Sequence, residues 1–282
     1  MELPTLPSSD QGRNYTLQER VGSGGFGTVY RGTDSEGNIV AIKKPHPLNG
    51  ISLEKIRFRL ELETILLQRT NHPNFVRHID HNLEEEPYLV MEYVPETLLN
   101  LIQKNTVTQQ VIEDYITQIP PVLQQLQKYN IAHCDLRSCN FGYIDGTIKV
   151  LDFGLAIPFN GTIFRRFPGD SSYFPPEFFL GMVLPVSDTY FAGKTLETLI
   201  TGERCPTIKE SIASIELYHG LKRLPDSLRK LLVGMIHPHD LKRKKPEELA
   251  ELAQEAIKTL QHRKVFDFSK FVQYTIPNAL DL

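Results

Sequence analysis

Hydrophobic and polar residues alternate along the first third of the chain, and glycines interrupt the alternation. Within residues 15–41 three short stretches alternate with a period of two, which predicts three antiparallel strands joined by tight turns. Residues 53–69 instead place hydrophobic side chains at close to helical spacing among charges, so an amphipathic helix is expected there. Two further strands are expected over residues 75–79 and 88–93, with acidic residues 84–86 in the turn between them.

After Pro95 the pattern becomes mainly helical. Helices are expected over residues 98–103, 111–129 and 187–201. Pro120 and Pro121 fall inside the second of these and are expected to kink or interrupt it, and strand-like alternation persists only around residues 141–151. A mainly β part followed by a mainly α part predicts an α+β fold class.

The same patterns suggest four segments along the chain. Residues 1–14 are rich in Pro, Ser, Asp and Gly and are expected to form a flexible leader. Residues 15–94 and 95–262 would form the two structured parts. Residues 263–282 would form a tail, aromatic enough either to dock onto the protein or to bind a partner.

Composition narrows the choice of partners and compartment. The chain has 282 residues, 40% hydrophobic and 23% charged, with a net charge of −3, so no global positive field attracts nucleic acid. No stretch is long and apolar enough to suggest a membrane span. Three cysteines without metal-ligand spacing favour a reducing compartment, and we expect the cytoplasm, or a host cytoplasm if the protein is a secreted bacterial effector. The sequence does not reveal the oligomeric state.

A glycine-rich motif is the first candidate for chemistry. Gly22, Gly24 and Gly27 fit the pattern G-x-G-x-x-G, which alone is compatible with a dinucleotide-binding turn. That turn would open a helix, but the residues that follow, from Thr28 to Gly32, alternate as in a strand. The glycines are therefore expected at the tip of a hairpin, where the backbone can lie close to phosphates.

A lysine and a glutamate follow this hairpin. Lys43 lies on the third predicted strand, where its ammonium could neutralise phosphates, although a lysine on a strand is more often simply solvated. Glu63, on the predicted helix, would hold Lys43 extended through an ion pair. Glu61 is the alternative partner, on a different face of that helix.

Four ordered motifs in the rest of the chain carry a family resemblance. They are HCDLRSCN at 133–140, DFG at 152–154, YFPPE at 173–177 and SDTYFAG at 187–193. With the glycine motif and Lys43, they make the chain resemble the eukaryotic-type protein kinase family, and its serine/threonine branch more than its tyrosine branch. The resemblance implies a bilobal fold, with a small β-rich N-lobe carrying one main helix and a larger α-helical C-lobe.

The resemblance also implies ATP and Mg²⁺ as cofactors and a protein substrate whose identity stays open. Asp152 and Asn140 would hold magnesium, because both offer the hard oxygen ligands that this ion prefers. Asp135 would accept or orient the proton of the substrate hydroxyl. Arg137, where serine/threonine kinases usually have lysine, would place a positive charge near the γ-phosphate.

The adenine position follows from the same resemblance. Val29 and Ala41 would pack against the base, and the backbone at Glu92 and Val94 would hydrogen-bond to it. Met91 would then stand at the gatekeeper position, although plain core packing would also account for a methionine there.

Some positions depart from the family pattern. Cys134 replaces an arginine that commonly pairs with a phosphorylated activation loop, which suggests largely constitutive activity. Asp170 stands where a threonine is usual, and this substitution puts the positioning of a peptide substrate in doubt. Arg243 is expected to pair with Glu177, as an arginine does in the family.

Two other functions fit the same fold and stay open at this point. The unusual residues would suit a pseudokinase acting as a binding or scaffolding module, and kinase-like folds also occur in small-molecule phosphotransferases. Retention of Lys43, Asp135, Asn140 and Asp152 as a set argues against the pseudokinase. The DFG motif and the helix that starts near Asp188 favour protein substrates over small molecules.

Overall fold

The computed structural model folds into two compact units. It describes residues 5–24, 26–46, 52–84, 86–161, 163–164, 173–202 and 224–262. The first unit comprises Met1–Pro95 and Lys149–Pro158, and the second comprises Glu96–Ile148 and Phe159–Leu282. The sequence had suggested one contiguous boundary near residue 95, whereas the short segment 149–158 belongs to the first unit.

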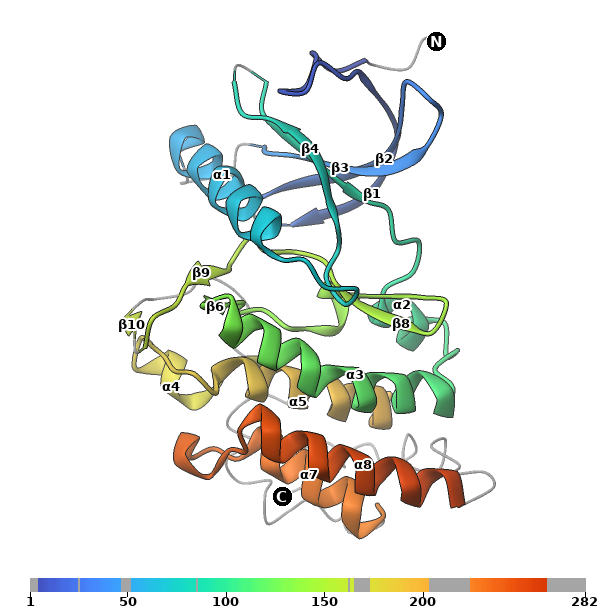
Figure 1. Cartoon of the computed structure of the whole chain (residues 1–282), viewed down its shortest axis with the longest axis vertical. Helices are drawn as coiled ribbons and strands as arrows, with labels where there is room; N and C mark the ends of the chain where they lie inside the picture. Colours follow the sequence, from blue (N-terminus) through green and yellow to red (C-terminus); the bar gives the residue numbers. More distant parts are fainter. Residues whose placement is uncertain are drawn as a thin grey trace, which may run out of the picture. The chain divides into compact units, whose positions relative to one another are not determined.

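The first unit is built on a five-stranded antiparallel sheet in the order β1-β2-β3-β5-β4 (Figure 1). Its elements are β1 (Tyr15–Gly24), β2 (Gly27–Asp34), β3 (Ile39–Lys44), α1 (Leu53–Arg69), β4 (His78–Asn82), β5 (Tyr88–Glu92) and β9 (Ile157–Pro158). The three N-terminal strands and the helix are thus confirmed. Helix α1 packs against β4 and β5, and its N-cap is Ser52, whose side chain accepts a hydrogen bond from the amide of Lys55.

Residues 5–14, which we call the strap, are not a flexible leader, so that prediction is wrong for the described part of the segment. Leu6 is buried in the core cluster with Tyr15 and Tyr88, and its amide donates to the carbonyl of Tyr15 at 2.9 Å. The hydroxyls of Ser9 and Tyr15 both donate to one carboxylate oxygen of Asp80, at 2.5 and 2.9 Å. Leu6 and Ser9 are the buried residues of the strap and hold it to β1 and β4, while its other residues are exposed.

The fourth strand also lies elsewhere than predicted. Apolar residues suggested a strand over 75–79, but β4 spans His78–Asn82. Phe75 and Val76 are buried next to Val150, whose carbonyl accepts from the amide of Val76 at 2.9 Å. In β4 the inward positions are the polar Asp80 and Asn82, which hydrogen bonds satisfy, so the alternation of hydrophobic residues did not reveal the strand.

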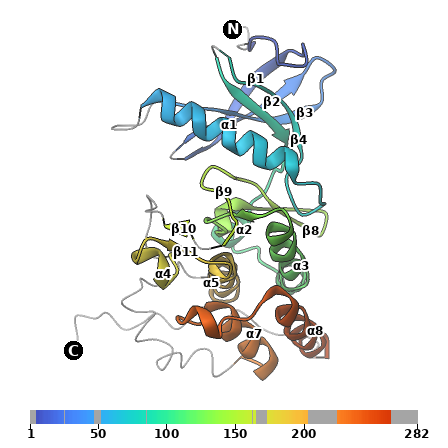
Figure 2. The same ribbon diagram turned by 60° about the vertical axis from the view of Figure 1, so that its left-hand side comes forward.

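The second unit is mainly helical. Its elements are α2 (Leu98–Gln103), α3 (Gln109–Lys128), β6 (Ile131–Ala132), the 3₁₀ helix η1 (Ser138–Asn140), β7 (Phe141–Ile144), β10 (Ile163–Phe164), α4 (Pro176–Phe179), β11 (Met182–Val183), α5 (Ser187–Thr201), α7 (Asp226–Ile236), the 3₁₀ helix η4 (Asp240–Lys242) and α8 (Pro246–His262). Strand β8 (Thr147–Val150), which pairs with β7, begins in the second unit and ends in the first. Helices α3, α5, α7 and α8 pack side by side (Figure 2). Helix α5 is buried from Ser187 to Ile200, which makes it the centre of this unit.

Helix α3 continues through Pro120 and Pro121, so the predicted interruption is wrong. Two prolines remove the amide donors for two helical carbonyls and cost stability in an isolated helix. In α3 the apolar residues before and after them, including Ile119 and Val122, are buried against the neighbouring helices. Tertiary burial therefore outweighs the local cost.

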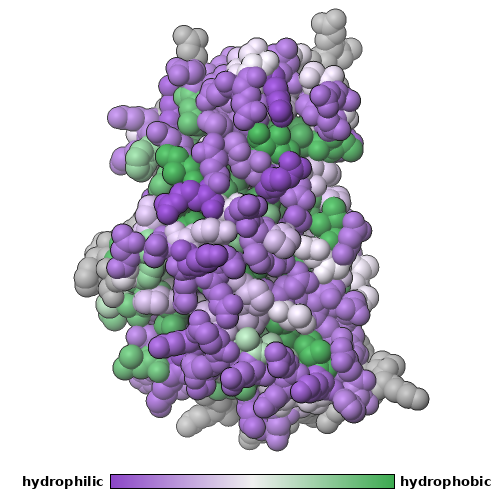
Figure 3. Space-filling model, viewed as in Figure 1, coloured by the Kyte–Doolittle hydropathy of each residue, from purple (hydrophilic) through white to green (hydrophobic). Residues whose placement is uncertain are grey.

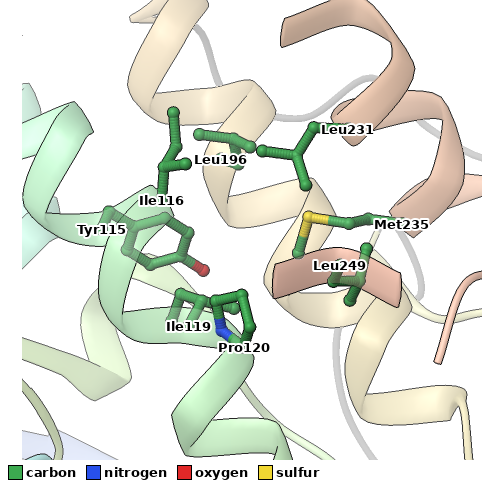
Figure 4. A pocket seen from close by; sticks show the side chains of 8 residues that line it. All are labelled: Tyr115, Ile116, Ile119, Pro120, Leu196, Leu231, Met235 and Leu249. Atoms are coloured by element: carbon green, nitrogen blue, oxygen red, sulfur yellow. The ribbon is translucent and has the colours of Figure 1, made fainter. Parts of the chain in front are cut away.

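A small apolar pocket lies among these four helices (Figure 4). It is lined by Tyr115, Ile116, Ile119, Pro120, Leu196, Leu231, Met235 and Leu249. Its cavity volume is about 10 Å³, which leaves room for no more than a single water-sized sphere. The pocket is a packing gap in the helical core and not a ligand site.

Hydrophobic residues on the face shown in Figure 3 form separate spots among hydrophilic ones. Scattered exposed apolar side chains are normal for a folded protein surface. None of the helices in the described ranges is long and apolar enough to cross a membrane.

Candidate active site

Three charged side chains meet in the first unit. Nζ of Lys43 lies 2.8 and 2.6 Å from the two carboxylate oxygens of Glu63 and 2.8 Å from Oδ1 of Asp152. Lys43 lies on β3 and Glu63 on α1, and both are buried, whereas the side chain of Asp152 is 43% exposed. The expected ion pair with Glu63 is present, and the rival Glu61 points to solvent on the exposed face of α1.

The lysine in this cluster stays positively charged. Burial lowers the pKa of Lys43, but the negative charges of Asp152 and Glu63 outweigh the burial, so its pKa is raised above the ordinary value. The amide of Phe153 donates to Glu63 at 3.3 Å and the amide of Gly154 donates to Asp152 at 2.8 Å. The first unit therefore holds an extended ammonium beside a partly exposed carboxylate.

Glycine at position 154 permits this close contact. A Cβ atom there would lie 2.9 Å from Oδ1 of Asp152 and 3.3 Å from Nζ of Lys43. The ring of Phe26, at the tip of the glycine hairpin, would also be 3.3 Å from that atom. Any larger residue would thus press on the ion pair and on the hairpin tip.

The glycine hairpin forms as predicted, with Gly24 paired to Gly27 at the end of β1 and β2. A Cβ added at Gly24 would meet no atom within 4 Å, and one at Gly22 would meet only Val29, at 4.0 Å. The protein's own packing therefore does not require glycine at these two positions. Gly27 differs, because a Cβ there would lie 2.6 Å from the carbonyl oxygen of Lys44.

The residues expected around adenine lie on neighbouring strands of the sheet. Ala41 pairs with Met91 across β3 and β5, and both are buried. Val29, on β2, pairs with Lys43. The amide of Glu92 donates to the carbonyl of Arg77 at 2.9 Å. A backbone hydrogen bond between Glu92 and adenine would therefore have to be one that the carbonyl of Glu92 accepts.

The second unit carries the other expected catalytic residues within one loop. Asp135 accepts from Nδ2 of Asn140 at 2.7 Å and lies 2.6 Å from Nε of Arg137. The same amide nitrogen of Asn140 also donates to the carbonyl of Asp135 at 2.9 Å. These bonds fix the amide of Asn140 so that its oxygen, which has a weak thiol donor in Cys139 at 3.5 Å, points away from Asp135.

Helix α5 holds this loop in place. Asp188 accepts from the backbone amides of His133 and Cys134 at 2.7 and 2.8 Å, and the hydroxyl of Thr195 donates to the carbonyl of Leu136 at 2.9 Å. Cys134 has a positive φ of 64°, a strained conformation for a residue with a side chain. Burial raises the pKa of Asp188 to about 6, although the two amide donors act in the opposite direction.

Sequence reasoning found the charged residues but missed several that position them. The contacts of Asp188 and Thr195 with the loop were not predicted, although the SDTYFAG motif could have indicated the first. Arg137 contacts Asp135 and lies 5.9 Å from the ring of Tyr173. Asp170, the third cysteine Cys205 and the tail 263–282 fall outside the described residues, so the expectations for them stay predictions.

Comparisons with known proteins agree with these motifs. A family model described as protein kinase domain matches residues 15–268. The chain is 31% identical over 207 residues to a G-type lectin S-receptor-like serine/threonine-protein kinase of Arabidopsis thaliana, covering 68% of this chain and 25% of that protein. It is 31% identical over 220 residues to a cysteine-rich receptor-like protein kinase of Oryza sativa subsp. japonica, covering 72% and 33%.

A bacterial protein is similar over a longer stretch. The chain is 30% identical over 268 residues to a probable serine/threonine-protein kinase of Clostridium acetobutylicum, covering 89% of this chain and 40% of that protein. The chain therefore spans between a quarter and two fifths of the length of these three relatives.

Proposed function

Because the chain belongs to the protein kinase domain family, we propose that it transfers the γ-phosphate of ATP to a serine or threonine hydroxyl of a protein. The observation that carries the proposal is the charged cluster of Lys43, Glu63 and Asp152, since a kinase needs an ammonium held extended for phosphates. The choice of serine or threonine rests on the similarity to the Arabidopsis serine/threonine-protein kinase and to the probable serine/threonine-protein kinase of Clostridium.

The residues present fit Mg-ATP. Gly22 and Gly24 leave open space beside their backbone, where a phosphate could approach the amide groups. Asp152 and Asn140 supply a carboxylate and an amide oxygen, the hard donors that magnesium accepts alongside phosphate oxygens. When bound, the metal would neutralise charge that develops on the phosphates.

Each of the charged residues of the proposed site would then have a separate role. Lys43, kept charged and extended by Glu63, would bind phosphate oxygens. Asp135, oriented by its bonds from Arg137 and Asn140, would accept or orient the proton of the acceptor hydroxyl. Arg137 would keep Asp135 in position and supply positive charge near the transferred group.

A kinase assay with matched variants tests this proposal. Lys43→Met and Asp135→Asn should each lower phosphate transfer from labelled Mg-ATP to a generic protein substrate by at least about 100-fold. Lys44→Met is the control, because Lys44 is the next residue on the same strand and pairs only with the exposed Glu86 among the described contacts. Its activity should stay close to wild type.

The products of the kinase assay distinguish the protein kinase from the alternative functions. Transfer that survives both Lys43→Met and Asp135→Asn would refute the site assignment. Nucleotide binding without transfer to any substrate would indicate a pseudokinase, and transfer only to small molecules would indicate a phosphotransferase of another class. Phosphotyrosine as the sole product would contradict the choice of serine or threonine.

We further propose that the protein acts in the cytoplasm, because its three cysteines, which lack metal-ligand spacing, are the cysteine usage of a reducing compartment. Cell fractionation with detection of the protein tests this location. Recovery in the secreted or extracellular fraction alone would contradict it.

A further inference from the structure

A short chain of polar side chains links the glycine hairpin to the end of β3. Oγ1 of Thr28, the first residue after the glycine motif, lies 3.1 Å from Nδ1 of His46. The same oxygen lies 3.4 Å from Oγ of Ser23 on β1. Thr28 is 9% exposed, so its hydroxyl has little access to water and depends on these partners.

The hairpin needs such a link because it can hardly fix its own position. Four of the six residues from Gly22 to Gly27 are glycines, which have the largest backbone freedom to lose on ordering. At Gly22 and Gly24 there is no side chain to pack and little protein within reach of one. Apart from the ring of Phe26, which lies near Arg59 and Gly154, the position of the tip therefore depends on the residues that flank it.

The backbone beside Thr28 makes the link stiff. Thr28 pairs with Lys44 across β2 and β3, and Gly27 is so close to the carbonyl of Lys44 that an added Cβ would lie 2.6 Å from it. His46 follows Lys44 by two residues, just after β3 ends. A side chain on β2 and a side chain just after β3 thus form a clamp at the base of the glycine hairpin.

We propose that Thr28 and His46 are positioning residues for the nucleotide: their hydrogen bond holds the glycine hairpin in the conformation that receives the phosphates of ATP. The inference rests on the proposed function, because it takes ATP as the ligand. Neither side chain has to touch the nucleotide. The clamp acts by ordering the hairpin before binding, so that less conformational entropy is lost when ATP binds.

The expected effect is on nucleotide affinity rather than on the chemical step. Loss of one intramolecular hydrogen bond should weaken Mg-ATP binding by about 3- to 10-fold. The KM for ATP should rise to a similar extent, while kcat should change less than twofold, because Lys43, Asp135 and Asp152 keep their contacts. A purely structural role would lower the melting temperature without this split between KM and kcat.

The test uses calorimetric titration of the full chain with Mg-ATP, steady-state kinetics and thermal melts. Thr28→Val removes the hydroxyl while keeping the shape, and Thr28→Ser restores it. His46→Leu removes the ring nitrogen. Thr33→Val, on the same strand but at its far end opposite Ile39, is the matched control for the threonine-to-valine change.

Support requires that Thr28→Val and His46→Leu each weaken binding, that the double variant is no weaker than either single one, and that Thr28→Ser and Thr33→Val bind like wild type. If wild type binds Mg-ATP and Thr28→Val binds equally well, the clamp is refuted while the proposed function stands. If the two single effects add in the double variant, the residues act separately and the clamp is likewise refuted. If well-folded wild type binds no nucleotide, the proposed function fails first.

Discussion

The buried ion pair between Arg243 and Glu177 gives the sharpest stability prediction. The guanidinium of Arg243 donates to both carboxylate oxygens of Glu177, at 2.6 and 2.7 Å. Its side chain is 0% exposed and that of Glu177 is 6% exposed. Ser187 also donates to Glu177 at 2.7 Å, so the pair joins α4, the start of α5 and the segment after α7 within the second unit.

The magnitude follows from this burial. Replacing Arg243 with methionine leaves the buried carboxylate of Glu177 without its opposite charge, and the carbonyl of His237 loses the donor Nε of Arg243, which lies 2.8 Å away in the wild type. Removing one partner of a buried pair typically costs about 3–5 kcal/mol. For a chain of this size, about 1 kcal/mol corresponds to 2–4 °C, so the melting temperature should fall by roughly 6–20 °C.

A double-mutant cycle measured by thermal unfolding checks the reasoning. Glu177→Met alone should destabilise by a similar amount, while Arg243→Met with Glu177→Met should cost clearly less than the sum, because no charge is left unpaired. Arg243→Lys is a control that keeps the charge but loses the bidentate hydrogen bonding, and its stability should lie between that of the wild type and that of Arg243→Met. The reasoning would be refuted if the destabilising effects of the two single substitutions added in the double variant, or if Arg243→Met lowered the melting temperature by less than about 2 °C.

Three further predictions follow from other buried groups. Asp80→Ala should cost about 1–3 kcal/mol and speed proteolytic cleavage of the strap, because the hydroxyls of Ser9 and Tyr15 lose their acceptor; unchanged cleavage would contradict this. Because burial raises the pKa of Asp188, the folded protein keeps this proton at a higher pH than the unfolded chain, and the stability that the proton contributes is lost as pH rises through about 6. Between pH 5 and 7 the free energy of unfolding of the wild type, measured by denaturant titration, should therefore fall by about 1 kcal/mol more than that of Asp188→Asn. An equal pH dependence of the two free energies would contradict this prediction. Because Cys134 stands in place of an arginine, phosphatase treatment should leave most kinase activity; loss of that activity would reject the idea of constitutive activity.

Much of the fold followed from periodicity, and two of the failures involve segments with buried polar residues. Helix α5 was predicted at its observed bounds, because its flanks carry clear signals such as Gly202, which ends the helix at a φ of 69°. Strand β4 was misplaced because its buried positions are polar, and the strap was expected to be flexible because Leu6 and Ser9 are its only buried residues within 5–14. A pattern of hydrophobic residues cannot show that Asp80 is fully buried, since the donors that make its burial tolerable come from other parts of the chain.

In the site, too, some residues could be predicted from the sequence and others could not. Residues that would act on a ligand, such as Lys43 and Asp152, must have a particular chemical type at a particular place, so type and order along the chain predict them. Residues that hold the site together depend on where distant segments meet: Asp188 reaches a loop 55 residues away in sequence. Thr28 and His46 have the same character, because a threonine and a histidine 18 residues apart carry no signal until two strands place them 3.1 Å apart. Sequence motifs therefore predict the chemistry of such a site better than they predict how rigidly it is held.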